Sequence, residues 1–150
     1  MGNAEDMATT RRTLTAPRDA VWRALSDGHT YSSWVVGTST IRAVDDDWPA
    51  QGSRLHYRVG RGPLTHDGHT EVLAMTEGSR LELEAHAWPV GTARIELLLA
   101  DAPDGGCEIT MVEHPARGTA AVLHNRVGDG LLKLRNLEAL RRLDRLALRH

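Results

Sequence analysis

Cysteine is almost missing from this chain, since Cys107 is the only one among 150 residues. A single cysteine forms no disulfide within the chain and builds no cysteine-rich zinc site. The sequence is therefore typical of a reducing compartment, and we expect a cytoplasmic protein.

Long apolar runs and an excess of charge of one sign are also missing. No apolar run approaches the roughly 18 residues of a membrane span, and residues 1–12 are polar, unlike a signal peptide. Eighteen basic residues oppose twenty acidic ones, so the net charge is −2. We expect no membrane insertion and no nucleic-acid partner, because no basic field exists to attract a polyanion.

The motifs of nucleophilic, phosphate and metal chemistry are absent or broken. The chain has no G-x-S-x-G motif, and Cys107 has no evident histidine partner. The lone Lys133 follows Leu132 and cannot complete a P-loop. His66 and His69 would face opposite sides of a strand, which disfavours a shared metal. We expect no cofactor and no metal site.

Alternating strands and a few helices are what the sequence does contain. Turn-forming stretches separate short runs rich in β-branched and apolar residues, and Pro17 marks a helix start. We expect a single domain over residues 1–150, with residues 1–8 as a disordered tail. The predicted strands are 9–15, 40–44, 54–59, 69–75, 80–88, 93–100 and 108–114, and the predicted helices are 17–26, 29–34 and 126–148.

Strand alternation assigns an inner face to the predicted sheet. Leu81, Leu83 and Ala85 alternate with charged residues, and the same phase turns Met111 and then Glu113 inward. The phase of residues 40–44 and 69–75 is less well defined. In the last helix, leucines 131, 134, 137 and 140 follow i, i+3 spacing and predict a buried stripe, with Arg135 outside it.

This order of elements, together with several short motifs, resembles the SRPBCC group, the START and Bet v 1-like proteins described as polyketide cyclase/dehydrase or lipid-transport domains. The motifs are A-P-R-D-A-V-W (16–22), Trp34 before Gly37, W-P-A-Q-G (48–52), Trp88-Pro89, Glu113-His114-Pro115, R-N-L-E (135–138) and L-R-R-L (140–143). The resemblance implies an α+β helix-grip fold, in which a curved antiparallel sheet of six to seven strands wraps around a long C-terminal helix.

A hydrophobic cavity follows if the inward positions are small. Ala43, Ala85, Ala87, Ala93 and Gly68 would leave room between sheet and helix for a lipid-like, polyketide-like or aromatic ligand. The expected ligand-binding residues are Trp34, Ile41, Tyr57, Val59, Thr70, Val72, Leu83, Ala85, Ile95, Leu97, Met111, Glu113, Val127, Leu131 and Leu134.

Two other functions stay open at this point. A carboxyl group buried among apolar side chains has a raised pKa, so Glu113, helped by Tyr57, could serve as acid and base in a cyclase or dehydratase. Glu113 could equally pair with an arginine at the rim, such as Arg117. Alternatively the cavity is vestigial and the protein, a monomer or homodimer, acts through a partner contact, for example on the basic face of its last helix or on an exposed edge of the sheet.

Overall fold

The computed structural model describes residues 8–35, 38–59, 63, 65–87, 91–117 and 126–149. The elements in chain order are β1 (Ala8–Leu14), α1 (Arg18–Ser26), η2 (Gly28–Thr30), α2 (Tyr31–Trp34), β2 (Thr38–Val44), β3 (Arg54–Val59), β4 (His66–Thr76), β5 (Arg80–Ala87), β6 (Gly91–Asp101), β7 (Cys107–Arg117) and α4 (Arg126–Leu148). Ala8, which the sequence assigned to a tail, is the first residue of β1. Residues 1–7 of that expected tail lie outside the described residues.

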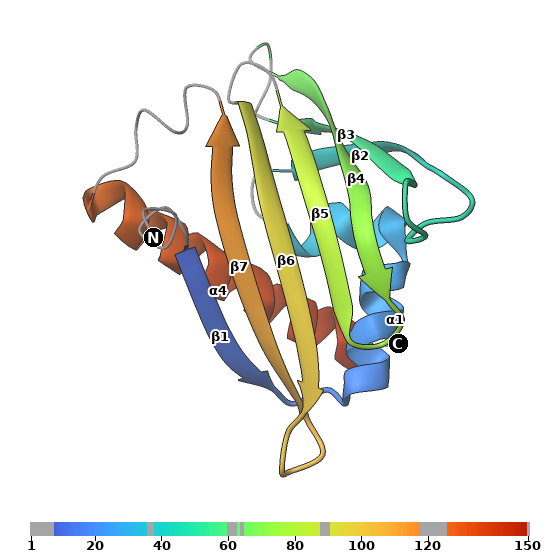
Figure 1. Ribbon diagram of the computed structural model, residues 1–150, viewed down its shortest axis with the longest axis vertical. Coiled ribbons are helices and arrows are strands. Elements are labelled where there is room, and N and C mark those ends of the chain that lie inside the picture. Colours follow the sequence, from blue (N-terminus) through green and yellow to red (C-terminus); the bar gives the residue numbers. More distant parts are fainter. Residues whose placement is uncertain are drawn as a thin grey trace.

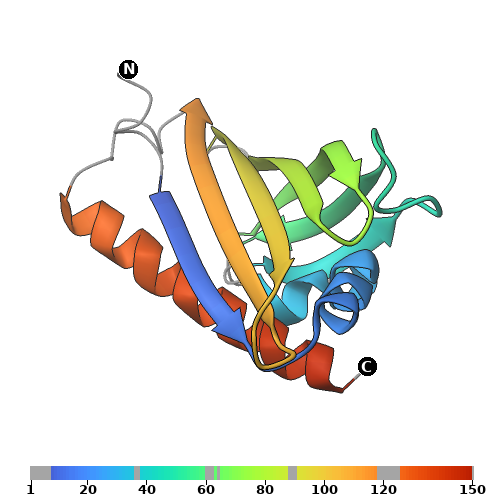
Figure 2. The same cartoon turned by 60° about the horizontal axis from the view of Figure 1, so that its bottom comes forward.

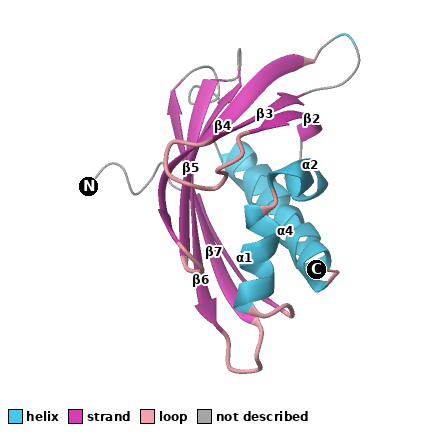
Figure 3. Ribbon diagram, turned by 90° about the vertical axis from the view of Figure 1, so that its right-hand side faces the viewer, coloured by secondary structure: helices cyan, strands magenta, loops and turns pink. Residues whose placement is uncertain are grey.

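The seven strands form one antiparallel sheet in the order β1-β7-β6-β5-β4-β3-β2. The sheet curves, and α1, α2 and α4 all lie on its concave side (Figures 1 and 3). Figure 2 shows α4 crossing beneath the strands from the β1 edge. The core lies between the sheet and the helices, as expected for a sheet with one solvated face.

Sequence alternation places the core residues of the central strands. Leu81 and Leu83 on β5 and Leu97 on β6 are each at most 1% exposed. The intervening charged residues form ion pairs on the outer face, for example Arg80 Nε to Glu96 Oε2 at 2.7 Å. The inward phase predicted for β5 and β6 is therefore confirmed.

The prediction that Ala43 faces inward is wrong, because its side chain is exposed. Two register shifts interrupt the pairing of β2 with β3, one between Thr38 and Thr40 and one between Ile41 and Ala43. A β-bulge of this kind shifts the alternation by one residue, so a simple period of two assigns the wrong face.

The buried face of α4 differs from the predicted leucine stripe. Leu134 is 64% exposed, so its predicted inward position is wrong. Over residues 134–148, where the side chains of α4 are described, the buried ones lie on a face rotated away from Leu134, and they are Asn136, Ala139, Leu140, Leu143 and Ala147. Small alanines let α4 pack closely on the sheet, and this packing decides the face more than leucine spacing does.

The carboxylate of Asp144 fixes α4 to the corner between β1 and α1. It accepts hydrogen bonds from the backbone N–H of Thr15 at 3.1 Å and of Ala16 at 3.0 Å. The Thr15 hydroxyl donates to the same carboxylate at 3.0 Å. These bonds set the height of α4 beneath the sheet.

Candidate functional site

Three hydroxyl groups form a buried chain between the sheet and α2. The Tyr57 hydroxyl lies 2.8 Å from Thr70 Oγ1, and the Tyr31 hydroxyl lies 3.3 Å from the same oxygen. Tyr57 also donates to the backbone oxygen of His69 at 3.3 Å. When it does so, Thr70 donates to Tyr57 and Tyr31 donates to Thr70, so the oxygen of Tyr31 keeps free acceptor capacity.

A glycine makes room for one member of this chain. A Cβ added at Gly68 would lie 2.8 Å from Cε1 of Tyr57 and 2.9 Å from the backbone oxygen of His86. The small residue at position 68 was predicted to leave a hollow, and instead the Tyr57 ring occupies the space beside it. That ring stacks on Tyr31, with centroids 5.5 Å apart, and Trp34 meets Tyr31 edge-on at 5.4 Å.

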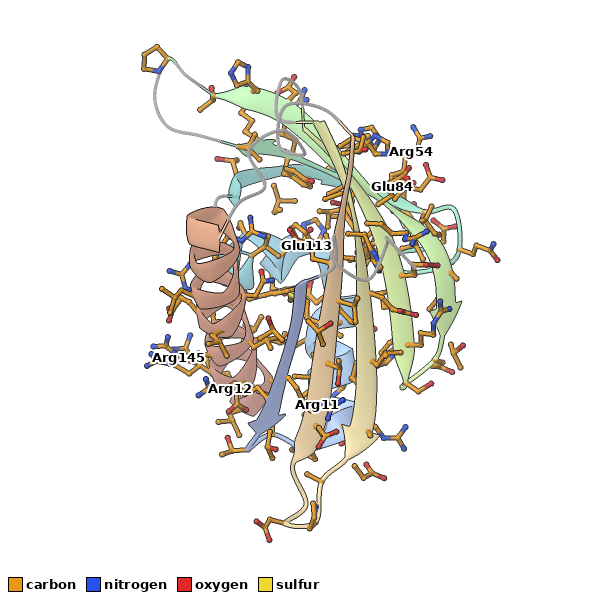
Figure 4. All side chains as sticks on the ribbon, turned by 60° about the vertical axis from the view of Figure 1, so that its left-hand side comes forward. Arg11, Arg12, Arg54, Glu84, Glu113 and Arg145 are labelled. Carbon is orange, nitrogen blue, oxygen red and sulfur yellow. The ribbon has the colours of Figure 1, made fainter. Side chains whose placement is uncertain are left out.

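Glu113 is the buried carboxylate that the strand phase predicts. Its side chain is 9% exposed, and Nη2 of Arg135 donates to both of its oxygens, at 2.8 and 2.9 Å. Figure 4 shows Glu113 between α4 and the strands, whereas Arg145 points away from the sheet. The sequence suggested a rim partner such as Arg117, but the partner comes from α4. Glu113 is therefore not a lone carboxyl group among apolar side chains.

Burial sets the protonation of the two tyrosines. Loss of hydration raises the pKa of Tyr31, and the neighbouring Tyr57 and the charge of Glu113 raise it further. Burial also raises the pKa of Tyr57, against the hydrogen bond from Thr70, which lowers it. Both phenols stay protonated at neutral pH, so they are hydrogen-bond donors and not bases.

The other residues expected to bind a ligand divide by their burial. Those buried on the inner face are Trp34, Tyr57, Thr70, Val72, Leu83, Leu97, Met111 and Glu113. Those that are half-buried are Ile41, Val59, Ala85 and Ile95. Leu134 is exposed and does not belong to this group. Val127 and Leu131 lie in α4, but their side chains are outside the described residues, as is the side chain of Ala87.

Sequence reasoning missed Tyr31 and Arg135. The predicted helix over residues 29–34 contains Tyr31, and a signal was available, because Tyr31 and Trp34 are spaced i, i+3 on a short helix that must pack somewhere. Arg135 carried no such signal. Its leucine-rich surroundings favoured a solvent-facing interpretation, and only the register of α4 against β7 brings it to Glu113.

Three histidines, from β3, β4 and β5, form a row on the outer face of the sheet. His69 stacks on His86 with centroids 4.6 Å apart and planes 12° apart, and His56 lies 6.0 Å from His69 on the other side. Parallel rings point their nitrogens side by side, not at one shared point. Within the described residues no group of three or more His, Cys, Asp or Glu is arranged to hold a metal ion.

Two other features lie away from this site. Burial raises the pKa of the Cys107 thiol to about 11, so the thiol is a poor nucleophile. Trp22 is partly buried and lines a surface pocket of about 480 Å³ at the start of α1. Charged groups in that pocket already pair with each other, as in Arg18 Nε to Asp101 Oδ1 at 3.0 Å.

No helix in the described part of the chain has the length and apolar character needed to cross a membrane.

Comparison with protein families gives a match along almost the whole chain. The model of a family described as polyketide cyclase / dehydrase and lipid transport matches residues 7–147. No curated protein is similar enough in sequence to be matched.

Solved structures share the fold at low sequence identity. Protein CV1439 from Chromobacterium violaceum has a TM-score of 0.73 at 18% identity, covering 95% of this chain and 97% of its own. Ara h 8.0201 has a TM-score of 0.72 at 14% identity, covering 96% and 98%. DynU16, from the dynemicin biosynthetic locus, has a TM-score of 0.65 at 21% identity, covering 93% of this chain and 46% of its own. The likeness confirms the Bet v 1-like helix-grip fold.

Proposed function

The chain belongs to the polyketide cyclase / dehydrase and lipid transport family, and from that premise we propose that it binds or carries a small hydrophobic ligand between the sheet and α4. The ligand is lipid-like, polyketide-like or aromatic. The chain acts as one domain over residues 1–150, as a monomer or homodimer, in the reducing cytoplasm. The single free cysteine supports that location.

The observation that carries this proposal is a polar cluster enclosed by an apolar core. As whole residues, Tyr31, Tyr57, Thr70 and Glu113 are each at most 7% exposed, and Leu83, Leu97 and Met111 line the same inner face. Ligand sites of this class combine an apolar wall with a few polar groups that fix orientation. Buried polar groups cost stability, so a binding role accounts for their retention in this core.

Proton transfer by Glu113 and Tyr57 is the weaker proposal. Both oxygens of Glu113 accept hydrogen bonds from Arg135, and Tyr57 donates to His69 and contacts Thr70. Both groups are therefore already engaged. Glu113→Gln tests the enzyme, because a cyclase or dehydratase would lose at least about a hundredfold in turnover without its general acid or base. A carrier would still hold its ligand.

Native mass spectrometry of protein purified from its own host tests the proposed function. We expect a co-purifying small molecule, together with enhanced fluorescence of added 1-anilinonaphthalene-8-sulfonate. Ala85→Phe fills the half-buried inner face of β5, and it should abolish both signals. Ala100→Phe, at an exposed position of β6, is the matched control and should retain them.

Circular dichroism must first establish that both variants fold. If Ala85→Phe folds and binds as the unaltered protein does, the ligand does not lie between sheet and α4. If the unaltered protein binds neither its own ligand nor the dye, the proposed function is wrong.

A further inference from the structure

We propose that Thr10 and Asn136 form a polar subsite that holds a neutral carbonyl oxygen of the ligand. This inference rests on the proposed function and adds the chemical class of the ligand's polar group. A ketone, ester or amide carbonyl attached to an apolar body would occupy the subsite.

Two buried polar atoms without partners carry the inference. Oγ1 of Thr10 and Nδ2 of Asn136 have no hydrogen-bond partner, although these residues are only 4% and 3% exposed. The large majority of buried polar side-chain atoms in proteins are paired, because an unpaired one carries the full cost of its lost hydration. Two such atoms on β1 and α4, which pack against each other, therefore indicate that something else supplies their partner.

Strand register and α4 place both residues beside the buried ion pair. On β1, Ala8 pairs with Glu113 and Thr10 pairs with Met111. Thr10 is therefore opposite the residue two positions before Glu113 on β7. Asn136 directly follows Arg135, which binds Glu113. Among the strands, α4 packs chiefly against β1. Thr10 and Asn136 are thus buried side chains of two elements that pack against each other close to this ion pair.

The hydrogen bonds already made fix what the subsite offers. Oδ1 of Asn136 accepts from Nη2 of Arg135 at 3.3 Å, which orients the amide so that Nδ2 is the free end. Nδ2 carries two unused hydrogens, and the hydroxyl of Thr10 supplies a third donor. One carbonyl oxygen has two lone pairs and can accept from both residues.

Charge selects a neutral group over an anion. Glu113 and Arg135 compensate each other, so this ion pair leaves no unpaired positive charge for a ligand carboxylate to neutralise. An anionic group would instead lie near the carboxylate of Glu113 in a poorly hydrated space, which is costly. A neutral carbonyl avoids this cost and still accepts both hydrogen bonds.

Two probes that differ in one oxygen test the subsite. 2-Acetylnaphthalene and 2-ethylnaphthalene have nearly the same shape, and only the first carries a carbonyl. Titrations followed by tryptophan fluorescence should give roughly tenfold tighter binding of the ketone to the unaltered protein, as one good hydrogen bond supplies. Thr10→Val and Asn136→Leu should each reduce this ratio toward one while leaving the affinity for 2-ethylnaphthalene nearly the same.

The controls lie on the same strand. Thr13→Val changes an exposed threonine of β1 and should leave the ratio as it is. Thr10→Ser keeps the hydroxyl at position 10 and loses only the methyl group, so it should retain the preference for the ketone. The comparison of Thr10→Val with Thr10→Ser still tests the subsite if Asn136→Leu fails to fold.

The outcomes separate the two proposals. If the unaltered protein binds both probes equally, or if Thr10→Val keeps the ketone preference, the subsite is wrong while the apolar site stands. If neither probe binds, the proposed function fails and the subsite fails with it.

Discussion

At the scale of single residues, the ion pair between Glu113 and Arg135 joins groups with unequal access to water. The side chain of Glu113 is 9% exposed, whereas that of Arg135 is 43% exposed. Removing either partner leaves the other unpaired, but only Arg135 can turn to water to recover hydration.

Replacing Arg135 should therefore lower the free energy of unfolding more than replacing Glu113. We expect Arg135→Met to lower the free energy of unfolding by about 2 kcal/mol or more, because a buried carboxylate is left without a partner. Glu113→Gln should cost about 1 kcal/mol, because the amide still accepts a hydrogen bond and Arg135 remains half-hydrated. Urea unfolding of both variants measures the difference, and equal costs would contradict the assignment of Glu113 as the more deeply buried partner.

Gly68 provides a second prediction at this scale. Gly68→Ala brings a methyl group against the Tyr57 ring and the backbone oxygen of His86, both within 3 Å. Overpacking of this kind costs about 1 to 3 kcal/mol, and here it also displaces Tyr57 from Thr70. Thermal unfolding should show the loss, and ligand affinity should fall with it. A variant of unchanged stability and affinity would mean that the Tyr57 ring is not confined by position 68.

At the scale of elements, the outer face of β3, β4 and β5 carries a row of histidines. Desolvation, His86, Arg54 and His56 lower the pKa of His69 below its ordinary value of 6.5, and Glu71 opposes them. The carboxylate of Glu84 lies against the ring nitrogen of His86, at 2.8 Å. Protonation of His69 is therefore less favourable in the folded sheet than in the unfolded chain.

Stability should consequently fall as the pH drops below 6.5. The unfolded chain takes up a proton on His69 before the folded chain does, so this contribution is fully present above 6.5 and is lost as the pH falls through the lowered pKa. His69→Gln should flatten the slope of the unfolding free energy between pH 7 and 5. His29→Gln, which changes an exposed histidine outside the row, is the control. An unchanged slope in His69→Gln would contradict the role of the row.

The corner between β1 and α1 depends on one carboxylate of α4. Asp144→Ala removes the acceptor for the backbone N–H groups of Thr15 and Ala16, and we expect a loss of about 2 kcal/mol in the free energy of unfolding. Hydrogen exchange should rise at those two amides. Glu138→Gln alters a carboxylate that pairs with arginines of α4 itself and binds no backbone N–H, and it should change stability little. Equal effects of the two variants would refute this anchoring role.

At the scale of the whole molecule, the fold followed from periodicity where the strands are regular. The predicted helix over residues 126–148 coincides with α4, and the predicted strand over 54–59 coincides with β3. Alternation placed Leu83 and Glu113 on the inner face because β5 and β7 keep a period of two up to these residues. The register shift opposite Leu83 lies on β4, between Val72 and Ala74, and does not change the phase of β5. The face of Ala43 was missed because bulges are tertiary features that a period of two does not contain.

The candidate site was less accessible to sequence reasoning for the same reason. Glu113 could be found, because strand phase is local information. Arg135, Thr10 and Asn136 acquire their roles only when α4 docks at one height beneath β1 and β7. Side chains that meet across a helix–sheet interface depend on that height, and no local pattern states it.

The order of the strands has one more consequence, which concerns synthesis on the ribosome. β1 is made before the other six strands but pairs with β7, so that Arg11 and Thr110, which share a hydrogen bond, are separated by 99 positions. The anchor from Thr15 to Asp144 spans 129 positions. β1 therefore stays unpaired until β7 has been translated, and the emerging polypeptide is most exposed to aggregation during that interval.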